Sequence, residues 1–230
     1  MTNWYLGEKA GVLEFSGPDA VRFLNGQVTQ DVRKAAVGEL LPSCVTDAKG
    51  KLQFRVWLAG KDEKVLVFCR GEDIEALEAR LTRYLIADDV EVRDVSGEIS
   101  AGDFDFPDVG LSEEERIEKG LPKWGAELKE GMLPPEAGLD VTDISYNKGC
   151  YIGQEVISRI KSAGKVNRRL VRLKFEKEGA SCGDVVNAEG KVCGEVTSVS
   201  SVLGLGYLKR GVDESEDLNA GGISVHLRDL

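Results

Sequence analysis

The sequence predicts an α+β fold, with a largely antiparallel sheet and helices in its N-terminal part and a small β-barrel at its C-terminal end. Three observations lead to this prediction: strand patterns joined mostly by short turns, helical patterns between them, and a series of short strand patterns after Arg168. The chain has 230 residues, of which 42% are hydrophobic, which suffices for a globular core. We expect two domains, residues 1–164 and 165–230.

The N-terminal part contains predicted elements in the order β-α-β-β-β-α-β. In residues 52–58 apolar residues alternate with Gln53, Arg55 and Trp57, which is the period of a strand. Apolar residues at helical spacing predict a helix over 73–85, and an earlier helix opens at Pro18. The other predicted strands cover 12–15, 40–46, 65–69 and 90–92. Because most of these elements are joined by short turns, we expect antiparallel pairing with the helices on one side.

Charge is unevenly distributed along the chain, which has 30 basic and 40 acidic residues and a net charge of −10. Residues 101–140 hold eleven acidic residues against four basic ones, and Ser112 to Glu115 fit a capping box that opens a short helix ended by Gly120. From Lys165 onward ten basic residues balance ten acidic ones. The acidic total argues against broad, sequence-independent binding of nucleic acid.

Cysteine and histidine usage excludes several classes of site. The five cysteines are widely spaced and include no C-x-x-C pair, so we expect no disulfide framework, no metal site and a reducing, cytoplasmic location. His226 is the only histidine, and we expect it on the surface or at a strand end rather than in a hydrolase triad. No segment has the ~18–20 uncharged apolar residues of a membrane span, so we expect no membrane partner.

Residues 148–172 form a basic island in this acidic chain, with seven basic residues and a single acidic one, Glu155. Such an island attracts an anionic ligand, for example a carboxylate tail, a phosphate or a short piece of RNA. Alternatively, its bases pair with the acidic residues of 101–140. The charge pattern alone leaves both interpretations open.

Cys150 lies in this island, bracketed by Gly149 and Gly153, and ahead of a helix expected between about Gly153 and Gly164. A helix N-terminus and the nearby Lys148 both stabilise a thiolate, so Cys150 is a candidate reactive thiol. The alternative is a small cysteine buried in a turn.

Five sequence blocks, in order along the chain, carry a family resemblance. The most specific is Lys148-Gly149-Cys150-Tyr151-Ile152-Gly153-Gln154-Glu155, followed by Arg159 and Gly164. The other four lie at residues 17–31, 47–51, 116–125 and 135–139. Together they span nearly the whole chain and resemble the YgfZ-type folate-binding proteins, which are relatives of the glycine cleavage system T-protein, an aminomethyltransferase.

The resemblance implies a tetrahydrofolate site in the N-terminal part, with Arg116, Glu118 and Trp124 as its folate-binding residues. An arginine at this position could pair with a folate carboxylate, and a tryptophan could form a stacking or apolar wall. Two alternatives stay open: Arg116 neutralises its acidic neighbours in 113–115, and Trp124 belongs to the core.

One departure from the aminomethyltransferases concerns catalysis. Those enzymes place an essential aspartate on the strand after the second block, where this chain has Gln53 and Phe54, and no acidic residue occurs from Ala48 to Leu58. Without this carboxylate, carbon transfer loses the group that organises its proton chemistry.

The resemblance therefore implies a non-catalytic, folate-binding accessory protein that acts through Cys150. It would support the assembly or repair of iron–sulfur enzymes and tRNA modification, with those enzymes or their assembly factors as partners. A folate-dependent aminomethyltransferase or demethylase is the alternative. A further hypothesis is weak contact with tRNA through basic residues of the island: Arg159, Lys161, Lys165, Arg168 and Arg169.

Overall fold

The structure is a computed structural model that describes residues 9–107, 110–212 and 217–228. The chain forms two compact units, which are described separately. Unit 1 comprises residues 1–109, 130–134 and 139–162, and unit 2 comprises 110–129, 135–138 and 163–230. The segment 110–129, which the sequence-based division assigns to the first domain, thus groups with the C-terminal strands. Its side chains explain this grouping, because Arg116 and Glu127 are bonded to Ser198 in one of those strands.

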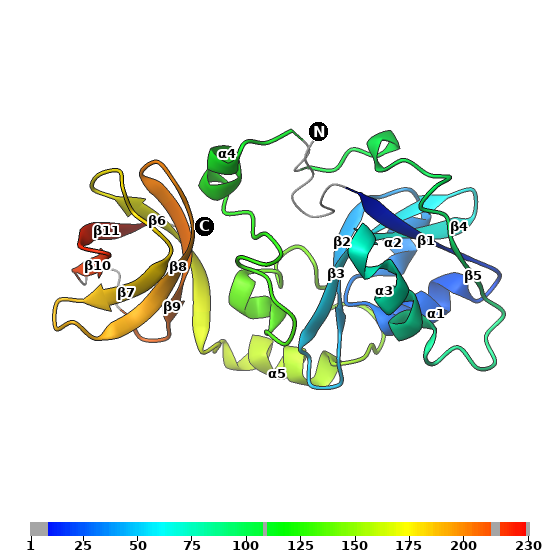
Figure 1. Cartoon of the computed structure of the whole chain (residues 1–230). Helices are drawn as coiled ribbons and strands as arrows, with labels where there is room; N and C mark the ends of the chain where they lie inside the picture. Colours follow the sequence, from blue (N-terminus) through cyan, green and yellow to red (C-terminus); the bar gives the residue numbers. More distant parts are fainter. Residues whose placement is uncertain (1–8, 108–109, 213–216, 229–230) are drawn as a thin grey trace. The chain divides into compact units, whose positions relative to one another are not determined.

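Unit 1 is built on a five-stranded antiparallel sheet in the order β2-β3-β4-β1-β5 (Figure 1, blue to cyan). Its strands are β1 (Ala10–Ser16), β2 (Leu41–Thr46), β3 (Leu52–Lys61), β4 (Lys64–Arg70) and β5 (Glu91–Asp94). Its helices are α1 (Ala20–Gln27), α2 (Val32–Ala36), α3 (Ile74–Thr82) and α5 (Gln154–Ala163). The last residue of α5 is grouped with unit 2. Short 3-10 turns lie at Gly71–Asp73 and Ala101–Asp103. The α+β prediction is confirmed, and the predicted elements occur in the predicted order, with helix α2 as an addition.

Helix α2 is an element that the sequence analysis did not predict. Its five residues are too few to show a helical period, and its start depends on a local cap instead. The side chain of Asp31 accepts a hydrogen bond from the backbone N–H of Arg33, which satisfies one of the unpaired donors at the helix start.

Both faces of the sheet in unit 1 are covered. On one face, strand residues such as Leu13 and Val67 share a buried cluster with Phe23 of α1 and Leu77 of α3. On the other face, Phe68 packs edge-to-face against the aromatic rings of residues 104 and 106, at centroid distances of 4.9 and 5.4 Å. The irregular segment after β5 therefore closes the second face of the sheet, which is why the strands in the centre of the sheet are buried.

Unit 2 contains a closed six-stranded barrel in the order β10-β11-β6-β9-β8-β7, which confirms the predicted C-terminal barrel (Figure 1, yellow to red). Its strands are β6 (Arg168–Phe175), β7 (Gly183–Asn187), β8 (Val192–Ser200), β9 (Leu203–Lys209), β10 (Leu218–Ala220) and β11 (Ile223–Arg228). Alternating apolar residues such as Val171, Leu173 and Phe175 fill its interior. His226 is exposed on β11, in line with the expectation for a strand histidine.

Helix α4 (Glu113–Glu118) also belongs to unit 2 and has the predicted capping box. Ser112 and Glu115 bond each other's backbone N–H groups. At the other end Gly120 has a φ of +70°, and the N–H of Leu121 bonds the carbonyl of Arg116, a pattern that satisfies carbonyls left open at a helix end. A 3-10 turn spans Pro134–Ala137. In the part of the chain that the structure describes, no helix combines the length and apolar character needed to cross a membrane.

Candidate functional site

The octapeptide around Cys150 is anchored by Lys148, whose side chain is buried. Its ammonium group donates three hydrogen bonds, to the backbone carbonyls of Asn25, Val28 and Gln30 at 2.7, 2.7 and 2.8 Å. These carbonyls lie at and just beyond the end of α1, where a helix leaves its last carbonyls without partners. Lys148 thus fixes the octapeptide to α1 by satisfying acceptors that the helix cannot satisfy itself.

Burial sets the protonation chemistry of Lys148. Removal from water lowers the pKa of Lys148 from 10.5 to about 7; the carboxylate of Asp31 acts in the opposite direction and the charge of Arg33 lowers it further. All three donors of the ammonium are directed at carbonyls, so Lys148 serves as an anchor rather than as a hydrogen-bond donor to the thiol of Cys150.

Gly153 provides the second anchor, through a close approach to the Asp47–Gly50 turn. Its φ is +90°, and a Cβ at this position would lie 2.5 Å from the carbonyl oxygen of Asp47 and 2.7 Å from the hydroxyl of Thr46. The hydroxyl of Thr46 donates to the carbonyl of Ile152 at 2.6 Å. Two of the blocks that carry the family resemblance are therefore in contact, and only glycine fits between them. Of the two glycines that bracket Cys150, only Gly153 has a positive φ.

Between these anchors the cysteine side chain faces solvent. Cys150 is free and exposed, which rules out the alternative of a cysteine buried in a turn. The next residue, Tyr151, is buried with Ile144 and Ile157, and its ring lies 5.1 Å from the ammonium of Lys148. Helix α5 begins four residues after Cys150, close to the predicted start. The geometry therefore presents one thiol on a rigid backbone.

The remaining octapeptide residues support the start of α5. The backbone N–H of Gln154 bonds the carbonyl of Tyr151 at 3.2 Å, and Glu155 forms an exposed ion pair with Arg159 at 2.7 Å. Among the described contacts, neither the Gln154 nor the Glu155 side chain touches the thiol of Cys150. We therefore assign both residues to the stabilisation of the first turn of α5.

Strand β3 holds two polar residues on one face. The side-chain oxygen of Gln53, one of the two residues that the resemblance places at the aspartate of the aminomethyltransferases, accepts a hydrogen bond from Arg80 at 2.7 Å. Two residues further, Arg55 forms a bidentate ion pair with Asp143 at 2.7 and 3.1 Å. The Asp143 side chain is fully buried and is also bonded by the hydroxyl of Thr142.

Sequence reasoning missed Asp143, although it identified Arg55 on the polar side of the strand. Asp143 is distant in sequence from β3, and nothing in its neighbourhood marks it as a partner. With both carboxylate oxygens bonded, it serves as an ion-pair partner and not as a free proton acceptor.

Arg116 is fully buried in unit 2, and all five of its N–H donors are used inside the protein. The guanidinium bonds Glu113 twice at 2.8 and 2.9 Å, Glu127 at 3.0 Å, the carbonyl of Leu121 at 2.6 Å and the hydroxyl of Ser198 at 2.8 Å. This arrangement favours the alternative in which Arg116 neutralises acidic neighbours. Its role in folate binding stays a prediction, and it would require one of these bonds to break.

The other two predicted folate residues also lie in unit 2. The side chain of Glu118 is exposed, and its backbone carbonyl accepts a hydrogen bond from Arg172 at 2.7 Å. Trp124 is half-buried and forms an isolated bridge with Leu128. The octapeptide, in contrast, lies in unit 1.

Several basic residues of the island 148–172 form ion pairs with acidic residues, which was one of the two interpretations of the charge pattern. The ammonium of Lys161 lies 4.0 Å from Asp140, and Arg168 pairs with Glu136 at 3.0 Å and with Glu195 at 3.1 Å. The part of the chain that the structure describes contains no group of three or more His, Cys, Asp or Glu residues placed to hold a metal ion.

Comparisons with known proteins agree with this architecture. Residues 167–229 match the family model of the CAF17 C-terminal β-barrel domain. The chain is 32% identical over 142 residues to the mitochondrial iron–sulfur cluster assembly factor IBA57 homolog of Phaeosphaeria nodorum, over 60% of this chain but only 33% of that protein. It is 25% identical to an uncharacterized protein of Haemophilus influenzae, over 86% of this chain and 84% of that protein.

A solved structure extends the similarity to the fold of the whole chain. The glycine cleavage system aminomethyltransferase T from Bartonella henselae superposes with a TM-score of 0.79, covering 96% of this chain and 83% of that chain at 15% sequence identity. At this identity the likeness concerns the fold alone. Together with the barrel match and the sequence relatives, it confirms the resemblance of this chain to the YgfZ-type proteins related to the aminomethyltransferases, and residues 167–229 match a CAF17-type C-terminal barrel.

Proposed function

We propose that this chain is a non-catalytic accessory protein that supports iron–sulfur enzymes through the thiol of Cys150. The observation that carries the proposal is the exposed Cys150 on a backbone fixed on one side by Lys148 and on the other by Gly153. Its sequence similarity to an iron–sulfur cluster assembly factor supports the same conclusion. Clients would include the iron–sulfur enzymes of tRNA modification, and the cytoplasm is the proposed location.

The chemistry of a single thiol limits what Cys150 can do with a cluster. Thiolate sulfur is a soft ligand that suits iron–sulfur clusters, but a stable cluster usually has four such ligands. Cys150 would therefore hold a cluster or its iron only in transit, while a client enzyme or a second copy of the chain supplies the other ligands. A fixed backbone helps here, because it removes the entropy cost of ordering the ligand at each encounter.

We further propose that the chain binds a tetrahydrofolate, as the related aminomethyltransferases suggest, without transferring a carbon unit. The Gln53 side chain supports this view, because an amide bonded to Arg80 does not accept a proton at neutral pH as a carboxylate does. An assay for aminomethyl or formaldehyde transfer to tetrahydrofolate should give the uncatalysed rate. Transfer clearly above that rate would revive the enzyme alternative.

Complementation tests the role of the thiol. In cells that lack this chain, the activity of an iron–sulfur enzyme should be restored by the wild-type chain and not by Cys150→Ala. Cys182→Ala is the matched control, because Cys182 is a second exposed thiol, located in the barrel. Equal melting temperatures of both variants would show that the fold is intact. Full restoration by Cys150→Ala would remove this thiol from the mechanism.

Ligand binding is tested separately by thermal shift and tryptophan fluorescence with tetrahydrofolate. A rise in melting temperature that saturates with ligand would support the folate assignment. If neither signal changes at millimolar ligand, the folate part of the proposal is wrong, while the role of Cys150 stands on the complementation result.

A further inference from the structure

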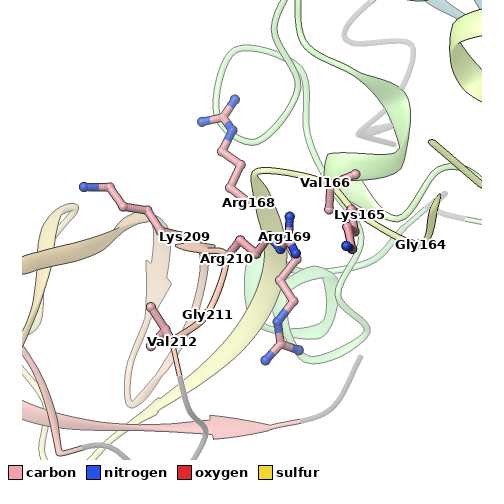
Figure 2. A pocket seen from close by; sticks show the side chains of 9 residues that line it. All are labelled: Gly164, Lys165, Val166, Arg168, Arg169, Lys209, Arg210, Gly211 and Val212. Atoms are coloured by element: carbon pink, nitrogen blue, oxygen red, sulfur yellow. The ribbon is translucent and has the colours of Figure 1, made fainter. Parts of the chain in front are cut away.

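Unit 2 contains a hollow of about 180 Å³ whose lining is strongly basic (Figure 2). Five of its nine lining residues carry a positive charge: Lys165, Arg168, Arg169, Lys209 and Arg210. The other four are glycine or valine, so none of the described lining residues is acidic; the acidic run that begins at Asp213 lies outside the described residues.

Strand pairing explains how these cations come together. Arg168 at the start of β6 lies directly opposite Lys209 at the end of β9, and the backbone N–H of Arg210 bonds the carbonyl of Asn167 at 2.8 Å. Figure 2 shows Arg168 and Arg169 leaving the start of β6 in opposite directions, as consecutive strand residues do. Like charges opposite each other on a sheet are destabilising, so the pairing of Arg168 with Lys209 by itself costs the fold free energy.

Partners within the protein account for only part of the positive charge. Arg168 pairs with Glu136 and Glu195 and stacks on the ring of Tyr207 at 4.4 Å. The ammonium of Lys209 donates to the backbone carbonyl of Val192 at 2.9 Å, a contact that leaves its charge unneutralised.

Lys165 and Arg210 are the exposed cations of the hollow that remain available. Among the residues that the structure describes, neither forms an ion pair. Both side chains are exposed, so a ligand can reach their charged ends directly.

The turns at the rim are open to a ligand as well. Gly164 and Gly211 have φ values of +62° and +88°, a conformation that glycine adopts without strain. At both positions no atom of the described residues lies within 4 Å of the place where a Cβ would be.

We propose that this hollow binds the phosphate groups of a small phosphorylated ligand, such as a diphosphate or triphosphate chain. Guanidinium and ammonium groups are the side chains that bind phosphate oxygens, and Lys165, Lys209 and Arg210, which form no ion pair among the described residues, match several phosphate charges better than a single carboxylate. The volume is about six times the ~30 Å³ that one water molecule occupies, which accommodates two or three phosphoryl groups.

Size and charge favour a short ligand over RNA. Electrostatic attraction in solution extends over about 8 Å at physiological salt, so a ligand confined to the hollow interacts mainly with its five cations. A longer polyanion extends beyond them along a C-terminal part in which ten acidic residues balance ten basic ones, so its additional length gains little attraction. The proposal is independent of Cys150, which lies in unit 1.

Isothermal titration of the full chain with inorganic phosphate, pyrophosphate and tripolyphosphate at low salt tests the proposal. We expect one site per chain, with affinity rising from phosphate to tripolyphosphate and falling as salt is added. The double variant Lys165→Gln/Arg210→Gln should weaken pyrophosphate binding roughly tenfold or more, because charge-assisted hydrogen bonds are lost. The control is Lys177→Gln/Lys191→Gln, which removes two exposed charges from unit 2 outside the hollow and should leave binding unchanged.

Three results would overturn the proposal. Equal weakening by both double variants would show general charge attraction instead of a site. No heat with any of the three phosphate compounds, at millimolar concentration and with an intact melting curve, would show that the hollow takes no phosphate. A third contrary result concerns a 20-nucleotide RNA. If this RNA binds, if tripolyphosphate does not displace it, and if Lys165→Gln/Arg210→Gln abolishes its binding, the hollow is a site for nucleic acid.

Discussion

Replacing Arg116 by methionine tests whether the buried network of unit 2 is structural. Methionine replaces the apolar part of the arginine side chain, but it removes the cation and its five hydrogen-bond donors. Of the contacts described for the fully buried Glu127 carboxylate, those with the hydroxyls of Thr197 and Ser198 and with the backbone N–H of Lys123 then remain.

The expected cost follows from this uncompensated charge. Removing one partner of a buried ion pair typically costs about 3–5 kcal/mol, a large fraction of the ~5–15 kcal/mol that stabilises a folded protein. For a chain of this size, the corresponding fall in melting temperature is roughly 6–20 °C. Glu113 contributes as well: burial acts to raise its pKa, but the hydrogen bond and charge of Arg116 outweigh this and hold it below the usual value.

Urea unfolding followed by circular dichroism measures the effect, and a double-mutant cycle assigns it. Arg116→Met, Glu127→Gln and the double variant should give a coupling free energy of about 1–3 kcal/mol. Arg116→Lys, with three donors in place of five, should lose less stability than Arg116→Met. A loss below about 1 kcal/mol for Arg116→Met, accompanied by loss of tetrahydrofolate binding, would refute the structural role and favour a ligand contact.

Three more predictions concern the glycine and cysteine positions. Gly153→Ala should destabilise the chain by about 1–3 kcal/mol, because its Cβ would meet the carbonyl of Asp47 at 2.5 Å, whereas Gly149→Ala, with nothing within 4 Å, should be near neutral in the same melt. A thiol reagent at pH 8 should modify two of the five cysteines in the folded chain and all five after unfolding. Rapid modification of more than two cysteines in the folded chain would contradict the burial of the other three. Burial raises the pKa of Cys69 to about 12, so the folded state keeps a proton that the unfolded state loses near pH 8.5, and this thiol alone should lower the free energy of unfolding by up to about 1.4 kcal/mol per pH unit above that value. The pKa of Cys44 is raised by burial as well, so that thiol adds a fall of its own. Cys69→Ala should make the total fall less steep between pH 8.5 and 10.5, and an unchanged slope would contradict the attribution.

Local patterns predicted the elements of the fold because each depends on neighbouring residues. The alternation in β3, the capping box at Ser112 and the end of α5 at Gly164 all have causes within a few positions in the sequence. Helix α2 escaped prediction because its start depends on one side-chain cap and it is too short for a period.

The candidate site could be predicted only in part, because its contacts join distant segments. The octapeptide was found through the resemblance, but the use of Lys148 as an anchor depends on carbonyls more than 110 positions away in the sequence. The same is true of the ion pair between Arg55 and Asp143, with a separation of 88 positions. Charge counting identified the basic island, but it did not reveal that Arg168 pairs with Glu136 and also lines a hollow together with Lys209 and Arg210.

Reactivation of a purified, cluster-depleted [4Fe–4S] enzyme tests the central claim most directly. With iron, sulfide and a reducing thiol present, adding the wild-type chain should raise the yield of active enzyme. Cys182→Ala should raise it equally, and Cys150→Ala should give only the yield obtained without the chain. Reactivation by Cys150→Ala at the wild-type level, with an unchanged melting temperature, would contradict the claim that the anchored, exposed thiol is what this protein supplies to its clients.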